Sequence, residues 1–103
     1  MSNTDHLLVT VNNHTKNDIY FDMQIICPND IKVKMEINNK GKNKLKISDT
    51  KVDAKKLVYR HVCFEYQGND SGSSQATIEI TCKDKNKHIS LNKKQIINLI
   101  RIK

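Results

Sequence analysis

Residues 19–27, IYFDMQIIC, alternate apolar and polar side chains with a period of two, and this alternation decides the fold class. The apolar side of the segment consists of Ile19, Phe21, Met23, Ile25 and Cys27. The opposite side begins with Tyr20, Asp22 and Gln24. Successive side chains of a strand point to opposite faces, whereas a helix repeats every 3.6 residues or so. The segment is therefore predicted to be a β-strand that buries its odd-numbered residues.

The same period recurs along the chain and is separated by turn-forming stretches such as NNHTKND (12–18), NNKGKN (38–43) and QGNDSGSS (67–74). Short strands joined by short connections favour antiparallel sheets over βαβ units. The pattern predicts an all-β fold, an antiparallel β-sandwich of about 7–8 strands that is loosely immunoglobulin-like. The residues expected to point inward are Leu7, Val9, Val11, Ile31, Val33, Met35, Ile37, Leu45, Ile47, Val58, Val62, Phe64, Tyr66, Ala76, Ile78, Ile80 and Cys82.

The length of 103 residues suits one domain with a modest core. We expect residues 1–5 to form a flexible tail and residues 6–103 to form the sandwich. The stretch SDTKVDAKK, residues 48–56, is the one connection that we expect to carry the chain from one sheet to the other. Residues 92–103 fit either a strand or a short helix, because Ile96, Ile97 and Ile100 would also share a helical face, and their β-branched side chains favour a strand.

The protein is basic, with a net charge of +7 and a pI near 9.4. Such a charge is typical of proteins that bind nucleic acid or anionic surfaces. Lys, Asn and Ile together supply 41 of the 103 residues, however, and their codons are rich in A and T, so an AT-rich genome explains part of the basicity. Arginine, the preferred side chain for bidentate phosphate contacts, occurs only at positions 60 and 101.

Most of the net positive charge lies in residues 31–47, IKVKMEINNKGKNKLKI, which we expect to form a hairpin. Either Ile37 or Met35 would lie opposite Leu45, and in both registers Glu36 faces a lysine. A solvated outer face is the simpler interpretation, since lysines also protect strand edges. The alternative is a site for an anionic ligand, whether nucleic acid, acidic glycan or a charged membrane surface, formed by Lys32, Lys34, Lys40, Lys42, Lys44 and Lys46.

The sequence contains no paired carboxylates, metal-ligand spacing or glycine-rich nucleotide loop, so we expect neither an enzyme nor a bound cofactor or metal. The four histidines are dispersed, and His61 interrupts an apolar strand without a defined partner. The odd number of cysteines, with no CxxC pair, favours reduced thiols. Cys27 and Cys82 share the inward phase and would pair only in an oxidising compartment.

Three large side chains, Leu8, Tyr20 and Ile26, fall on the outward phase of the first two strands. An outward face with such residues suits a contact with another protein. We therefore expect a non-catalytic protein–protein interaction or assembly module that binds a protein partner or associates with itself. The sequence shows no transmembrane segment, because no apolar run reaches about 18 residues. We expect a cytoplasmic protein if Met1 is the native start, and a secreted or periplasmic one if the chain is a trimmed mature form.

Overall fold

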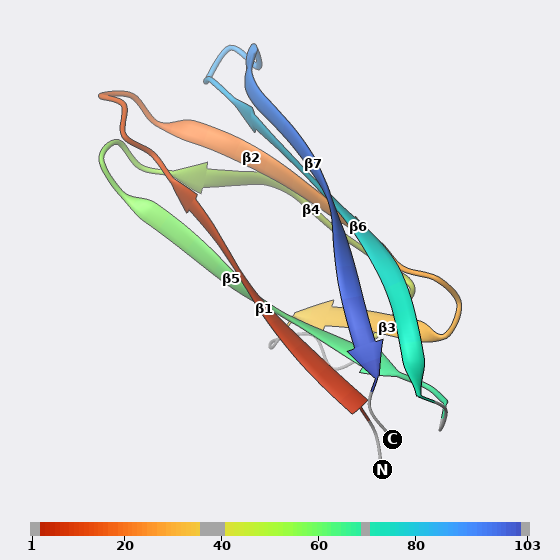
Figure 1. Ribbon diagram of the computed structural model, residues 1–103. Helices are drawn as coiled ribbons and strands as arrows, with labels where there is room; N and C mark the ends of the chain where they lie inside the picture. The colour runs from red at the N-terminus through yellow and green to blue at the C-terminus, as the bar shows by residue number, and fades with distance from the viewer. Residues whose placement is uncertain (1–2, 36–40, 69–70, 102–103) are drawn as a thin grey trace.

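The computed structural model describes residues 3–35, 41–68 and 71–101 and is an elongated sandwich of two β-sheets (Figure 1). One sheet has three strands in the order β1-β5-β3, and the other has four in the order β4-β2-β6-β7. Every neighbouring pair of strands is antiparallel. The predicted all-β antiparallel sandwich is confirmed, and the described residues contain seven strands.

The strands are β1 (Asn3–Asn12), β2 (Ile19–Ile26), β3 (Ile31–Met35), β4 (Lys44–Val52), β5 (Leu57–Tyr66), β6 (Gly72–Lys83) and β7 (Ile89–Arg101). The C-terminal segment is a strand, as its β-branched content favoured, because β6 offers it a partner from Gly72 to Lys83. At the other end, β1 begins at Asn3, within the segment expected to be a tail, and Thr4 pairs with Glu65 of β5.

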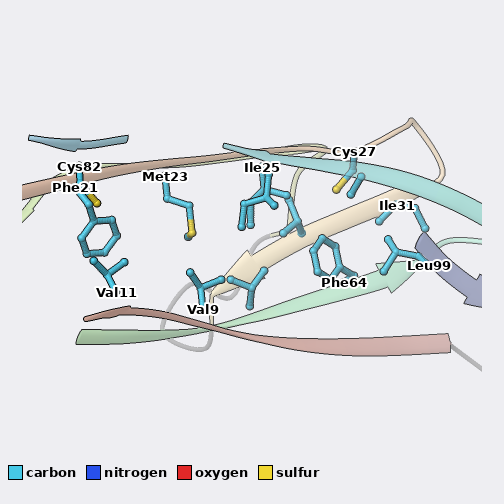
Figure 2. Close-up of a cluster of buried hydrophobic side chains, with 14 of the residues drawn as sticks. Val9, Val11, Phe21, Met23, Ile25, Cys27, Ile31, Phe64, Cys82 and Leu99 are labelled. Carbon is cyan, nitrogen blue, oxygen red and sulfur yellow. The ribbon is translucent and has the colours of Figure 1, made fainter. Parts of the chain in front are cut away.

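The core lies between the two sheets and consists mainly of the side chains expected to point inward (Figure 2), together with Val52 and Leu99, which were not predicted. Phe21, Met23 and Ile25 of β2 are at most 1% exposed, and Val33 and Val62 from the opposite sheet are equally buried. Burying a side chain of this size contributes about 1.5–3 kcal/mol. Ile37, also expected to point inward, lies outside the described residues.

The connections cross between the sheets far more often than expected. Successive strands from β1 to β6 alternate between the sheets, and only β6 and β7 are sequence neighbours within one sheet. The expectation that residues 48–56 alone make the crossing was therefore wrong. Packed sheets stand about 10 Å apart, and four extended residues span about 13 Å, so the connections 27–30 and 53–56 are long enough.

The cysteines are free thiols, and the register separates the two that share the inward phase. Cys82 lies opposite Phe21, six positions along β2 from Cys27, which corresponds to about 20 Å of strand. Figure 2 shows the two side chains at opposite ends of the core. A bridge between them needs Cα atoms closer than about 7 Å and is excluded by this register.

The described residues form neither a membrane-spanning helix nor a cluster of metal-ligating side chains. The part of the chain that the structure describes contains no helix that is long and apolar enough to cross a membrane. In the same ranges, 3–35, 41–68 and 71–101, no three His, Cys, Asp or Glu side chains lie together as metal ligands would.

Candidate interaction groove

An open groove runs between the edge strands β1 and β7, on the side of the sandwich where the three-stranded sheet is one strand short. It has a volume of about 540 Å³ and is lined mainly by β1, β6 and β7. This volume lies within the range of about 300–1,000 Å³ that is typical of ligand sites. The groove is therefore large enough to hold a segment of another chain.

The groove is open because no strand of the three-stranded sheet covers the inner residues of the first half of β7, Leu91, Lys93 and Gln95, whereas Leu99 near the end of the strand is buried in the core. Leu91 is paired with Cys82 and Gln95 with Ile78, so the β7 side chains share the inward face of their β6 partners. The β6 residues are buried, with Cys82 5% and Ile78 7% exposed, whereas Leu91 is 52% exposed. The inward-facing side chains from Leu91 to Gln95 thus lie at a surface, although a complete sandwich would bury them.

The described residues that line the groove are mainly apolar, with several neutral polar side chains and one lysine. Leu7, Val9 and Val11 supply the β1 wall and Ile78 and Ile80 part of the floor. Lys93, which is paired with Ile80, is on the inner face of β7 and is exposed. Within residues 3–35, 41–68 and 71–101, no Asp or Glu side chain lines the groove. This combination favours an apolar ligand that carries a negative charge.

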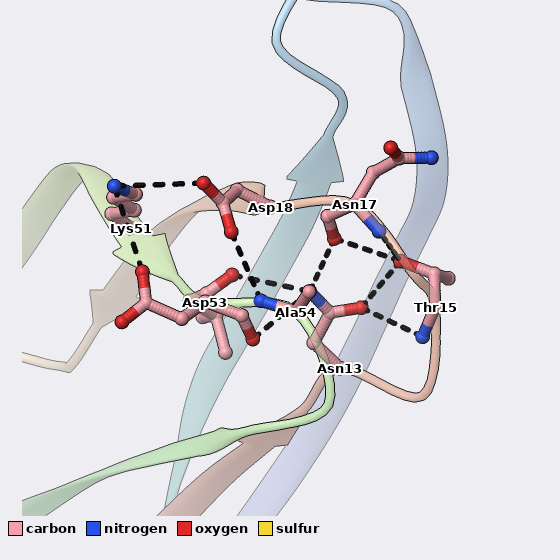
Figure 3. A network of polar contacts seen from close by, with 8 residues as sticks. Asn13, Thr15, Asn17, Asp18, Lys51, Asp53 and Ala54 are labelled. Atoms are coloured by element: carbon pink, nitrogen blue, oxygen red, sulfur yellow. Dashed lines mark hydrogen bonds and ion pairs between the residues drawn. The ribbon is translucent and has the colours of Figure 1, made fainter.

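The β1–β2 turn closes one end of the groove and is held by Asn13, which is 1% exposed (Figure 3). The Asn13 amide nitrogen donates to the carbonyl oxygens of Asn17, Val52 and Asp53 at 2.7, 3.1 and 3.2 Å. Its side-chain oxygen accepts from the backbone N–H and the hydroxyl of Thr15, at 3.0 and 2.7 Å. A single amide therefore ties the β1–β2 turn to the end of β4.

The residues predicted as a protein-interaction surface do not form one patch. Leu8, 61% exposed, lies on the outer face of the three-stranded sheet. Tyr20 and Ile26 lie on the outer face of the other sheet, at opposite ends of β2. Ile26 does have an apolar neighbour in the same row of that sheet, because it is paired with Thr77, which is paired with Ile96.

The predicted hairpin of residues 31–47 was wrong, because its two arms belong to different sheets. The β3 arm is paired with β5 and the β4 arm with β2, and the arms meet in one bridge between Val33 and Lys42. Lys32 and Lys34 alternate with buried residues and face outward from one sheet, whereas Lys44 and Lys46 face outward from the other. Lys40 lies outside the described residues. This separation does not support a single anionic-ligand site.

Outward-facing polar contacts stabilise the four-stranded sheet beside Tyr20. Asp22 accepts a hydrogen bond from the backbone N–H of Asp49 at 2.8 Å and pairs with the Lys83 ammonium at 2.9 Å. The backbone N–H of Asp49 and then the Lys83 ammonium lower the pKa of the Asp22 carboxyl. Both partners hold the carboxylate in its charged form, which suits a structural contact on this face.

Two histidines that appeared unrelated in the sequence are in contact. His6 Nδ1 and His61 Nε2 are 2.8 Å apart, and the rings stack with centroids 4.8 Å apart. One of these nitrogens must be unprotonated to accept the hydrogen bond. The contact depends on the β1–β5 register, which the spacing of the histidines along the chain does not contain.

The sequence interpretation also missed the groove residues Leu91, Lys93 and Gln95. The signal was a pair of polar residues on the inward phase of the last strand, and the competing helical interpretation of residues 92–103 concealed it. Polar side chains at positions that a closed sheet would bury indicate a strand that is not covered.

No protein-family model matches the chain, and no curated protein matches it in sequence. In structure, it is similar to the ASH / PapD-like domain of human CEP192 (PapD-like domain 7), with a TM-score of 0.61 and 12% identity. The match covers 97% of this chain and 73% of that chain. At this identity the likeness shows the fold alone, a PapD-like, immunoglobulin-like sandwich.

Proposed function

We propose that the protein is a non-catalytic protein-interaction module and that the groove between β1 and β7 is its contact surface. The observation that carries the proposal is the uncovered inner face of the first half of β7, where Leu91 is 52% exposed opposite the apolar wall of β1. An apolar inner face of this kind is stabilised when a partner covers it.

The chemistry of the groove supports binding rather than catalysis. Its lining has no carboxylate to act as a base or to orient His14. Burial raises the pKa of the Cys82 thiol, so this side chain is a poor nucleophile. The similar domain is described as PapD-like, and we extend to this chain the interaction role that such a sandwich suits.

Site-specific photocross-linking tests the proposal. A photoreactive amino acid replaces Leu91 in the groove, or Lys85 in the β6–β7 turn as the control, and the full chain is irradiated in an extract of its source cells. We expect a discrete protein adduct from position 91 and none from position 85. A third variant at Ile96 probes the outer face of the same strand.

Three outcomes would decide the proposal. An adduct from position 91 that excess unlabelled chain suppresses supports the groove as the contact surface. An adduct from position 96 alone keeps the interaction role but refutes the groove as its site. No adduct from either position contradicts the proposed function.

A further inference from the structure

Of the four edge strands that the described residues form, β1 is the one with no lysine, proline or register shift, and its single charged side chain, Asp5, precedes the groove residues Leu7–Asn12. Natural edges are protected by lysines, prolines, bulges or short length. Lysines lie on β3, which has five residues, on β4 and on β7. The ten residues of β1, NTDHLLVTVN, include no lysine, proline or glycine. All ten pair with β5 without a register shift, so β1 presents a long, regular edge.

The backbone hydrogen bonds show which residues of β1 face the open side. Asn13 N–H donates to the Lys56 carbonyl at 2.8 Å, immediately beyond the Asn12↔Leu57 pair. In an antiparallel ladder, hydrogen-bonded and non-hydrogen-bonded pairs alternate. The even-numbered residues, including Leu8 and Thr10, therefore direct their N–H and C=O groups away from β5 and towards the open side.

A strand added at this edge would complete the sandwich. It would lie about 4.8 Å from β1 and about 10 Å from the four-stranded sheet. At that position it faces Leu91, Lys93 and Gln95, the inner residues of β7 that line the groove. Main-chain hydrogen bonds to β1 and alternate side chains packed into the groove are the two components of strand addition.

We propose that the groove binds an extended segment of an acidic partner protein, which adds to β1 as a fourth strand of the three-stranded sheet. The segment has alternating apolar side chains that point into the groove and an Asp or Glu opposite Lys93. The groove follows β1 over the six residues from Leu7 to Asn12, so a segment of about six residues fills it, and a nine-residue peptide contains such a segment in several registers. This inference rests on the proposed function and names the partner chemistry for the same groove.

Charge distinguishes an acidic partner from a second copy of this chain. Each copy carries a net charge of +7, so pairing two β1 edges brings like-charged domains together. Among the described residues the lining holds Lys93 and no carboxylate, so the groove itself offers no counter-ion to this cation. An acidic segment supplies a carboxylate that can pair with the Lys93 ammonium, and the positive charge of the whole domain attracts it.

The test uses a displayed library of random nine-residue peptides selected on the full natural chain. We expect the enriched peptides to alternate apolar and polar residues and to contain one acidic residue on the apolar phase. The edge variant is Thr10→Pro, which removes a backbone N–H on the open side of β1. The Thr10 side chain is exposed, so we expect its loss to have little effect on the fold. Thr10→Ala keeps that N–H and is the matched control.

Thr10→Pro should weaken binding of the selected peptides by at least about tenfold, because it removes one hydrogen bond and its ring obstructs the incoming strand. Thr10→Ala should bind within about twofold of the natural chain. Thermal unfolding of both variants confirms that they fold. Lys93→Glu, which changes an exposed side chain, should reverse the selection in favour of Lys or Arg at the same peptide position.

The inference is overturned if the enriched peptides do not alternate, or if Thr10→Pro and Lys93→Glu bind them as the natural chain does. It is also overturned if the chain forms dimers that Thr10→Pro dissociates, because the occupant is then a second copy. The proposed function survives either result if the position 91 cross-link persists. The proposed function fails when the cross-links at positions 91 and 96 are both absent.

Discussion

Asn13 is the buried polar residue whose removal should destabilise the fold most clearly. In Asn13→Ala, the buried carbonyl of Val52 and the partly buried carbonyl of Asp53 lose the amide donor that contacts them at 3.1 and 3.2 Å. A buried carbonyl left without a partner costs about 1–3 kcal/mol. The exposed Thr15 groups recover hydrogen bonds from water and add little. We therefore expect a loss of about 2–4 kcal/mol in the free energy of unfolding.

This loss would be a large part of the total stability, which is about 5–15 kcal/mol for a single domain. It corresponds to a fall in Tm of about 10–25 °C. Urea unfolding followed by circular dichroism measures it, with an unchanged dependence on urea showing that the transition remains two-state. Asn17→Ala is the control, because that exposed residue contributes its backbone carbonyl, and it should cost less than about 0.5 kcal/mol.

A second substitution at the same position tests the direction of the hydrogen bonds. Asn13→Asp keeps an acceptor for Thr15 but directs a carboxylate at the carbonyls of Val52 and Asp53. These surroundings raise the pKa of the introduced carboxyl in the native state above its unfolded value of about 3.9. The native state then takes up a proton first as the pH falls, so the destabilisation shrinks from pH 7 towards pH 4. A cost below about 1 kcal/mol for Asn13→Ala, or no pH dependence for Asn13→Asp, would refute this account.

Two further predictions concern the thiols and the Asp22 carboxylate. Burial raises the pKa of Cys27 to about 11 and also raises the pKa of Cys63. Cys63 is only partly buried, whereas Cys27 and Cys82 are buried. Ellman's reagent at pH 8 should therefore label Cys63 first, and should label Cys27 and Cys82 only as the chain unfolds. Equal rates for all three would contradict the buried placement. The pKa of Asp22 is lowered first by the hydrogen bond from the backbone N–H of Asp49 and then by Lys83. The Asp22 carboxylate therefore stabilises the fold above about pH 4, and this stabilisation is lost as the pH falls through the native pKa of Asp22. The difference in unfolding free energy between the natural chain and Asp22→Asn should shrink between pH 5 and pH 2, and a constant difference would show that the contact is not ionic.

The period of two predicted most of the buried side chains, because burial parity is a local property of a strand, but it missed Val52, Leu99 and Asn13. Val33 and Phe64 point into the core for the same reason as Phe21, each lying between neighbours that face outward. The strand at the C-terminus was harder to predict, because Ile96, Ile97 and Ile100 fit both periods. The long β6 partner decides between them, and that partner is a tertiary contact.

Which strands pair could not be predicted from the same pattern. A β3–β4 hairpin and the observed arrangement both place Val33 and Leu45 inward, so the alternation does not distinguish them. The groove has the same origin, because it follows from three strands facing four. The position of Lys93 at a groove rather than at a closed core is therefore a consequence of topology, although its inward phase was visible in the sequence.

The distribution of lysines gives the charge of residues 31–47 a structural meaning. Lys32 and Lys34 lie on the edge strand β3, and Lys44 and Lys46 lie on the edge strand β4. Lysines at these places oppose pairing with a second basic domain. This protective role explains their positions without an anionic ligand. The same protection at β7 and its absence from β1 leave one edge where strand addition meets no lysine. Because the uncovered first half of the inner face of β7 lies beside that edge, the side of the sandwich that lacks a strand is also the side where we propose that one is added.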